Sequence, residues 1–158
     1  ADEPVLFTEF VAGVCEAFES YEGGLKLDLP NEEYELEVDK LRVRLLITNL
    51  LNNAMRHGEG NPIAVKLAYN SKGVKLEVID QGEGIAEEHL SQITEPFYRA
   101  DSSRQRNTGG FGLGLYLCRL IAQAHGGELS ISSKLGEGTH ISVQLPPHPP
   151  RIEADDSE

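Results

Sequence analysis

Three stretches of the chain carry apolar residues at intervals of three and four, the spacing of an amphipathic helix. The stretches cover residues 7–21, 39–57 and 112–124. Asp39 is expected to cap the start of the second helix, and Gly58 to mark its end, because a further glycine and a proline follow closely. The pattern therefore predicts three helices that are well separated along the chain.

Between these helices, apolar and polar residues alternate as they do in strands with one buried face. The alternating runs cover residues 25–29, 34–38, 63–70, 73–80, 128–133 and 138–146. Short turns join several neighbouring runs, which favours antiparallel pairing. This order of helices and hairpins indicates an α/β two-layer sandwich, with a mixed, mostly antiparallel sheet and about three helices on one face.

One long segment shows neither the helical nor the strand spacing of apolar residues. Residues 81–110 are rich in Gly, Ser, Arg and Asn, with a short helical stretch expected at 87–93. Such an irregular segment inside a compact domain is usually a functional loop or lid. We expect a single domain at residues 1–146, a lid at about 86–110, and a disordered tail at 147–158, which has too few apolar groups to pack.

The net charge narrows the choice of ligands. The 158 residues carry a formal charge of −12 at pH 7, which argues against nucleic acid and against docking on an anionic membrane, because both need clustered Lys and Arg. A nucleotide needs only local cations, backbone N–H groups and a metal ion, so acidity does not exclude it. Cys15 and Cys118 lack metal-site spacing and are expected to be reduced and buried. No apolar run is long enough to span a bilayer, so we expect a soluble domain.

Candidate chemistry begins in the second helix, where Asn49, Asn53 and Arg56 fall within a narrow arc beside the apolar stripe. Asparagine is a poor helix former, so it is unfavourable for the helix itself. An amide oxygen suits Mg²⁺, and a guanidinium suits a phosphate. The arc therefore indicates a magnesium–phosphate site, with a solvated helix edge as the alternative.

Two glycine-rich segments follow. In DQGEGI, Asp80 stands at a strand end, where a carboxylate can accept a hydrogen bond from an amine such as that of adenine, and the glycines let a flat ring approach. A tight turn with a capping Asp is the alternative. The second segment, GGFGLGL at residues 109–115, leads into the third helix and exposes backbone N–H groups that favour anions. It is neither a P-loop nor a dinucleotide fingerprint.

The lid between these two segments is locally basic. Arg99, Arg104 and Arg106 stand within eight positions of an otherwise acidic chain. Their guanidinium groups would neutralise phosphate oxygens when the lid closes. For each arginine taken singly, a solvated loop position is the alternative.

The order of these motifs resembles that of a known family. NLLNNA, DQGEGI, EPFYR, GGFGLGL and GEGT follow one another as in the catalytic domain of sensor histidine kinases, where they are similar to the N, G1, F and G2 boxes and a final glycine–threonine turn. The resemblance covers residues 5–146. It implies the Bergerat ATP-binding fold, which gyrase, mismatch-repair and chaperone ATPases share, and it implies ATP and Mg²⁺ as cofactors.

The resemblance also implies a role for individual residues. Asn53 resembles the Mg²⁺ ligand, with Asn49 near the phosphates. Arg56 and His57 would face phosphate or ribose, and Asp80 resembles the carboxylate that reads adenine. The other implied nucleotide-binding residues are Gly82, Gly84 and Ile85 around the ring, the F-box aromatic Phe97, the lid cation Arg106 near the γ-phosphate, Gly110, Gly112 and Gly114 around the triphosphate with Leu113 supporting their turn, and Thr139 beside adenine.

Position 49 separates the subfamilies of this resemblance. The hydrolysing relatives carry a Glu there as the base for an attacking water, whereas Asn49 accepts no proton usefully at neutral pH, which favours transfer to a histidine. Two alternatives stay open: an ATPase coupled to conformational change, and a non-catalytic module that binds nucleotide or a partner protein.

The phosphoacceptor itself is missing from the chain. None of the five histidines stands in the family's phosphoacceptor pattern. We therefore expect the acceptor on a histidine-containing dimerisation domain, in the same parent chain or in trans, with a response regulator downstream. The resemblance also implies a cytoplasmic domain whose parent protein is anchored in the bacterial inner membrane.

Overall fold

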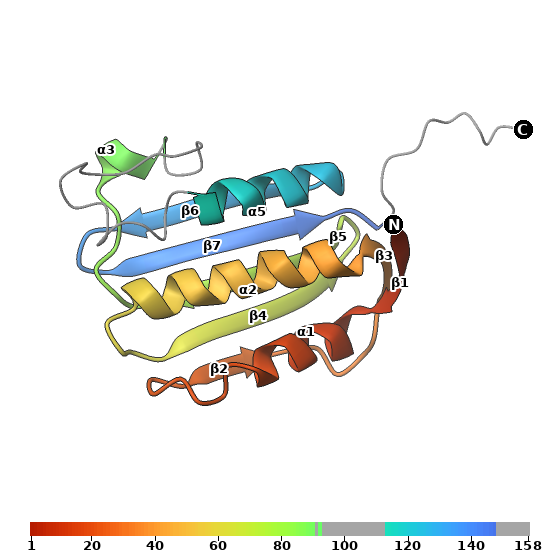
Figure 1. The fold of residues 1–158 in the computed structure, drawn as a ribbon, viewed down its shortest axis with the longest axis horizontal. Coiled ribbons are helices and arrows are strands. Elements are labelled where there is room, and N and C mark those ends of the chain that lie inside the picture. The colour runs from red at the N-terminus through yellow and green to blue at the C-terminus, as the bar shows by residue number, and fades with distance from the viewer. Residues whose placement is uncertain (91, 93–112, 148–158) are drawn as a thin grey trace, which may run out of the picture.

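The computed structural model describes residues 1–90, 92 and 113–147, which form two layers (Figure 1). Helices α1 (Phe7–Glu16), α2 (Lys40–His57) and α5 (Leu113–Ala124) cover one face of a five-stranded sheet, and a short helix, α3 (Glu87–Leu90), lies at one end. The predicted α/β two-layer sandwich is confirmed. The strands of the sheet, in spatial order, are β2 (Leu25–Asp28), β4 (Ile63–Asn70), β5 (Gly73–Asp80), β7 (Gly138–Leu145) and β6 (Glu128–Lys134).

The sheet is mixed and mostly antiparallel, as the sequence predicts. Strands β4 and β5 form the expected hairpin, and β7 pairs antiparallel with both β5 and β6. Strand β2 pairs parallel with β4 because a long connection that includes α2 separates them along the chain. The alternation of side chains puts one apolar row beneath the helices, formed by Val65, Val78, Ile141 and Ile131 in register.

A second, two-stranded sheet stands at the start of the chain. Strand β1 (Asp2–Leu6) pairs antiparallel with β3 (Glu35–Asp39), so that Asp2 lies opposite Asp39. The sequence does not predict β1, because Pro4 and the acidic residues around it are unfavourable in strands. The strand expected at residues 34–38 is present as β3, but it belongs to this small sheet rather than to the main one.

Helix α1 is shorter than its apolar spacing predicts, because regular helix ends at Glu16 rather than near residue 21. Beyond it the chain continues in turns with hydrogen bonds between residues three apart, such as from Phe18 N–H to the Cys15 carbonyl at 2.9 Å. Phe18 and Tyr21 still pack against the core from these turns. The turns therefore satisfy the same apolar pattern without extending the helix.

Helices α1 and α2 begin with different caps. Asp39 caps α2 as expected, since its Oδ1 accepts from the Arg42 N–H at 3.1 Å. The residue that precedes α1 offers no side-chain cap. Instead Glu33, distant in sequence, accepts from the N–H groups of Thr8 at 2.9 Å and Glu9 at 2.8 Å. A carboxylate at this helix start also has a favourable interaction with the helix dipole.

The core lies between the sheet and the helices, with Phe7, Ile47 and Leu115 among its fully buried side chains. Cys15 and Cys118 are free thiols inside it, as expected, and burial raises their pKa to about 11 and about 12. Among the described residues, no helix combines the length and the apolar character that crossing a bilayer requires.

Candidate active site

The end of α2 lies against the end of β5. A β-carbon placed on Gly58 would lie 3.5 Å from the Asp80 β-carbon, and Glu83 N–H donates to the His57 carbonyl at 3.3 Å. Asn53 precedes His57 by about one turn of the same helix. The structure therefore brings the candidate metal ligand and the candidate adenine-reading carboxylate to the same end of the two layers, where α3 also lies (Figure 1).

The arc of polar residues on α2 is not uniform. Asn53 is 4% exposed, Asn49 is half-buried, and Arg56 is exposed. Neither the amide oxygen nor the amide nitrogen of Asn53 has a hydrogen-bond partner among the described residues. A buried amide without a partner costs about 1–3 kcal/mol, so its retention in a helix that it already disfavours points to a ligand.

The donor chemistry around Asn53 fits Mg²⁺. The described residues hold no cluster of three or more His, Cys, Asp or Glu side chains that would form an all-protein metal cage. Mg²⁺ usually keeps several waters and binds through few protein oxygens together with substrate phosphates. One buried amide oxygen is therefore a sufficient protein ligand when a phosphate chain supplies others.

Asp80 is the last residue of β5 and is 3% exposed. Its Oδ1 accepts hydrogen bonds from the backbone N–H groups of Gly82 at 2.9 Å and Thr139 at 3.3 Å. Burial raises the pKa of this carboxyl, and the two hydrogen bonds act in the opposite direction. Because both donors use one oxygen, Oδ2 remains the oxygen available to an exocyclic amine.

Thr139 lies directly opposite Asp80 across the β5–β7 pair and is buried. Its hydroxyl lies 2.9 Å from the Ser133 hydroxyl, which donates to the Gly138 carbonyl at 2.8 Å. Ser133 in turn accepts from the Ile85 N–H at 2.8 Å. This chain of contacts joins three of the predicted site residues, Asp80, Ile85 and Thr139, through one serine that the sequence did not single out.

The glycines after Asp80 are required by backbone packing. A β-carbon on Gly82 would lie 1.8 Å from the His57 carbonyl oxygen, and one on Gly84 would lie 2.0 Å from the Lys134 carbonyl oxygen. Gly84 also has a φ of +76°, in the left-handed region. Protein atoms thus occupy the space that a side chain would need, while the approach of a ring to these glycines stays a prediction.

His57 and Glu83 form a pair that the sequence did not predict. The His57 Nδ1 lies 3.3 Å from the Glu83 Oε2, and the imidazole is buried whereas the carboxylate is exposed. Burial lowers the pKa of His57, and the hydrogen bond and charge of Glu83 oppose that effect. Burial is the larger cause, which favours a neutral imidazole. Glu83 occupies the variable position between the two glycines, so its motif gave no signal for this contact.

The candidate residues in and around the predicted lid divide into two groups. Helix α5 begins at Leu113, close to the expected position, and Gly114 stands in its first turn with open space where a β-carbon would be. No packing among the described residues therefore requires that glycine. The remaining candidates lie outside the described residues: Phe97, Arg99, Arg104, Arg106, Gly110 and Gly112.

The chain matches a known family and two kinds of sensor protein in sequence. Residues 38–149 match the family described as histidine kinase-, DNA gyrase B-, and HSP90-like ATPase. Over 125 residues the chain is 41% identical to the sensor histidine kinase YkoH of Bacillus subtilis (strain 168), covering 79% of this chain and 27% of that protein. Over 109 residues it is 40% identical to the sensor protein SrrB of Staphylococcus aureus, covering 68% of this chain and 19% of that protein. The chain thus spans about a quarter or less of the length of these relatives.

Solved structures agree on the fold. The catalytic domain of the histidine kinase ThkA superposes with a TM-score of 0.80 at 24% identity, covering 94% of this chain and 97% of that one. The mycobacterial sensor histidine kinase MprB gives a TM-score of 0.76 at 25% identity, covering 95% of this chain and all of the other. The chain belongs to the histidine kinase-, DNA gyrase B-, and HSP90-like ATPase family, and it is a catalytic domain of the sensor histidine kinase type.

Proposed function

We propose that the domain binds Mg-ATP at the end of α2 and β5 and presents the γ-phosphoryl group to a histidine on a separate dimerisation domain. The observation that carries this proposal is Asn53, a buried amide without a hydrogen-bond partner among the described residues, at the same end of the two layers as the buried carboxylate of Asp80. The amide of Asn53 suits a hydrated cation with phosphates, and the carboxylate of Asp80 suits an exocyclic amine.

In this proposal Asn53 holds the metal ion, which when bound neutralises charge on the phosphates. Asp80 orients the base through Oδ2, while Gly82 and Thr139 hold Oδ1 in place. Arg56, exposed on the same helix face, supplies a cation that reaches phosphate or ribose. The contribution of the chain is therefore positioning and charge neutralisation rather than covalent chemistry. His57 borders the same set, and the roles proposed for Phe97, Arg106, Gly110 and Gly112 belong to the lid segment.

Transfer to histidine is favoured over hydrolysis by the residue at position 49. A carboxamide does not act as general base at neutral pH, so Asn49 cannot activate a water for attack on the γ-phosphorus. The acceptor histidine, a response regulator that takes the phosphoryl group from it, and a membrane-anchored parent protein follow from the likeness to sensor kinases. These three expectations are part of the same proposal.

The test compares two neighbouring asparagines of α2. Asn53→Ala removes the buried amide, and Asn52→Ala removes an exposed amide from the same turn as a matched control. Calorimetric titration with a non-hydrolysable ATP analogue should show that Mg²⁺ strengthens binding to the unmodified chain and to Asn52→Ala but not to Asn53→Ala. Equal dependence on Mg²⁺ in both variants would refute the metal role of Asn53.

Kinase and ATPase activity are separated in a second measurement with γ-labelled ATP. We expect no label on the isolated domain and no steady release of phosphate. Label should appear on a histidine-hairpin domain that is supplied in trans. Steady phosphate release that Asn49→Ala abolishes would favour the ATPase instead.

A further inference from the structure

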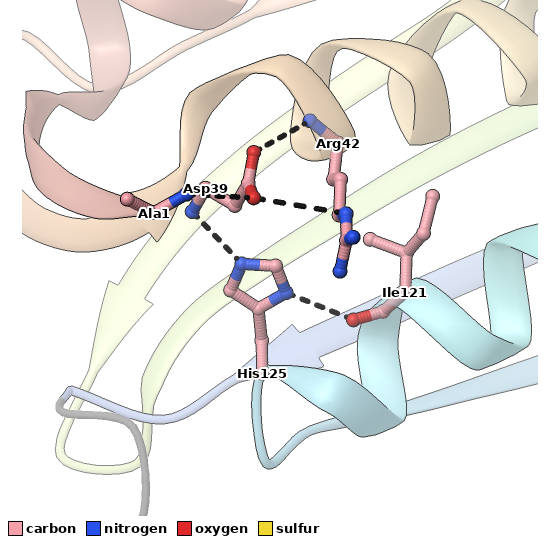
Figure 2. Close-up of polar contacts among 5 residues, drawn as sticks. All are labelled: Ala1, Asp39, Arg42, Ile121 and His125. Carbon is pink, nitrogen blue, oxygen red and sulfur yellow. Dashed lines mark hydrogen bonds and ion pairs between the residues drawn. The ribbon is translucent and has the colours of Figure 1, made fainter.

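His125 links the far ends of the two helices that border the site. Its Nδ1 lies 2.9 Å from the Ile121 carbonyl oxygen in the last turn of α5, and its Nε2 lies 3.0 Å from the backbone nitrogen of Asp39 (Figure 2). The imidazole is 6% exposed. A carbonyl only accepts and a backbone N–H only donates, so Nδ1 carries the proton and Nε2 accepts. One neutral tautomer of the imidazole therefore makes both hydrogen bonds, one at each ring nitrogen.

Each end of this link is a defined point in the fold. Asp39 is the N-cap of α2, and its side chain accepts from Arg42 N–H in the first turn of that helix. His125 directly follows α5, where its own N–H donates to the carbonyls of Ile121 and Ala122. The imidazole therefore joins the start of α2 to the end of α5, as Figure 2 shows.

The opposite ends of the same helices border the proposed nucleotide site. Helix α2 runs from its N-cap Asp39 toward Asn53 and His57, and α5 runs from its first turn, at Gly114, toward His125. The helices pack against each other, and near their middle the Cys118 thiol lies 3.6 Å from the Leu46 carbonyl oxygen. This contact and the His125 link are two hydrogen bonds that join α2 and its N-cap to α5 and the residue that follows it.

We propose that His125 is a positioning residue for nucleotide binding, because it fixes the angle between α2 and α5. This inference rests on the proposed function of the site. Helix α5 has 12 residues and is therefore about 18 Å long at about 1.5 Å per residue. A tilt of about 3° at its His125 end moves its first turn by about 1 Å, a displacement large enough to impair a site of this kind.

Two amide substitutions separate the two hydrogen bonds. In His125→Gln, the longer side chain places its carbonyl oxygen near the position of Nε2 and can still accept from Asp39 N–H. In His125→Asn, the shorter side chain retains only the donor to the Ile121 carbonyl. The matched control is His140→Asn. The ring of His140 contacts Glu77 on the sheet face opposite the one that α1, α2 and α5 cover.

Binding of a non-hydrolysable ATP analogue with Mg²⁺ is measured for all four chains at a temperature at which melting curves show each fully folded. Hydrogen exchange of the Asp39 amide is followed alongside. We expect His125→Gln and His140→Asn to bind within about threefold of the unmodified chain. His125→Asn should bind about tenfold more weakly, the effect of one lost hydrogen bond, with faster exchange at Asp39.

Two outcomes overturn the inference alone: normal binding by His125→Asn despite faster exchange at Asp39, or equally weak binding by both amide variants. The first would show that the link does not set the site, and the second that the Asp39 contact is not the feature that matters. Failure of the unmodified chain to bind the analogue would refute the proposed function as well. In that case the exchange at Asp39 would still show whether His125 holds the start of α2.

Discussion

Replacing Asp80 by asparagine should weaken nucleotide binding while making the fold more stable. The two backbone donors, Gly82 and Thr139, both reach Oδ1. An asparagine carbonyl oxygen can take over both contacts in the same space, and its NH₂ group then replaces Oδ2. The variant therefore keeps the local hydrogen bonds, loses a buried negative charge, and places a donor where the adenine amine needs an acceptor.

The loss of affinity follows from the type of hydrogen bond. A hydrogen bond to a charged acceptor contributes about 1.5–3 kcal/mol, which corresponds to about 10- to 150-fold in the dissociation constant. Two facing donors repel each other, so the loss should lie toward the upper end of that range. Calorimetric titration with an ATP analogue measures it directly.

The size of the stability effect depends on pH. Burial raises the folded-state pKa of Asp80 above its unfolded value, so protonation favours the folded protein. The stabilising contribution of the carboxyl is fully present below the unfolded pKa, about 4, and is lost as the pH rises through the folded pKa. The advantage of Asp80→Asn should therefore grow between pH 4 and pH 7.5, as measured by denaturant unfolding of both chains. Unchanged affinity, or a variant that is less stable than the original at pH 7.5, would refute this account of Asp80.

Two further substitutions test features described above. Gly114→Ala should stabilise the fold by up to about 1 kcal/mol, because no described residue lies within 4 Å of the added β-carbon, yet weaken binding of the ATP analogue. A stabilised variant with full affinity would remove Gly114 from the site. Glu33→Ala should lower the free energy of unfolding by about 0.5–2 kcal/mol through loss of the cap on α1, whereas Glu32→Ala, which removes a neighbouring exposed carboxylate, should leave it nearly unchanged. Equal effects of these two variants in chemical denaturation would show that Glu33 does not act as a cap.

Local patterns were sufficient to predict much of the fold. Helix α2 has a capping aspartate, a continuous apolar stripe and a glycine at its end, all of which are local signals. The β4–β5 hairpin shows clear alternation on both strands. In contrast, β1 was not predicted because its pairing with β3 joins residues more than 25 positions apart, and its own composition is unfavourable for a strand.

The site, like the fold, was predicted only where local sequence patterns carry the information. Sequence spacing placed Asn49, Asn53 and Arg56 on one arc, but only the packing of the layers makes Asn53 buried and leaves Arg56 exposed. The contacts made by Glu83 and His125 depend on segments that meet only in the folded chain. No periodicity or motif in the sequence predicts such contacts, so only the structure identifies the roles of these two residues.

A side chain at Gly82 or Gly84 would collide with the backbone of the chain. This collision affects how well such motifs distinguish active enzymes from relatives that have lost activity. Their glycines are demanded by neighbouring carbonyl groups of the chain itself, so a relative that had lost its catalytic role would still have to keep them in order to fold. The motif DQGEGI is therefore a signature of the backbone path rather than of activity. A better marker of a working member is Asn53, whose buried amide has no hydrogen-bond partner among the described residues, because the proposed function gives that amide a role in binding a cation.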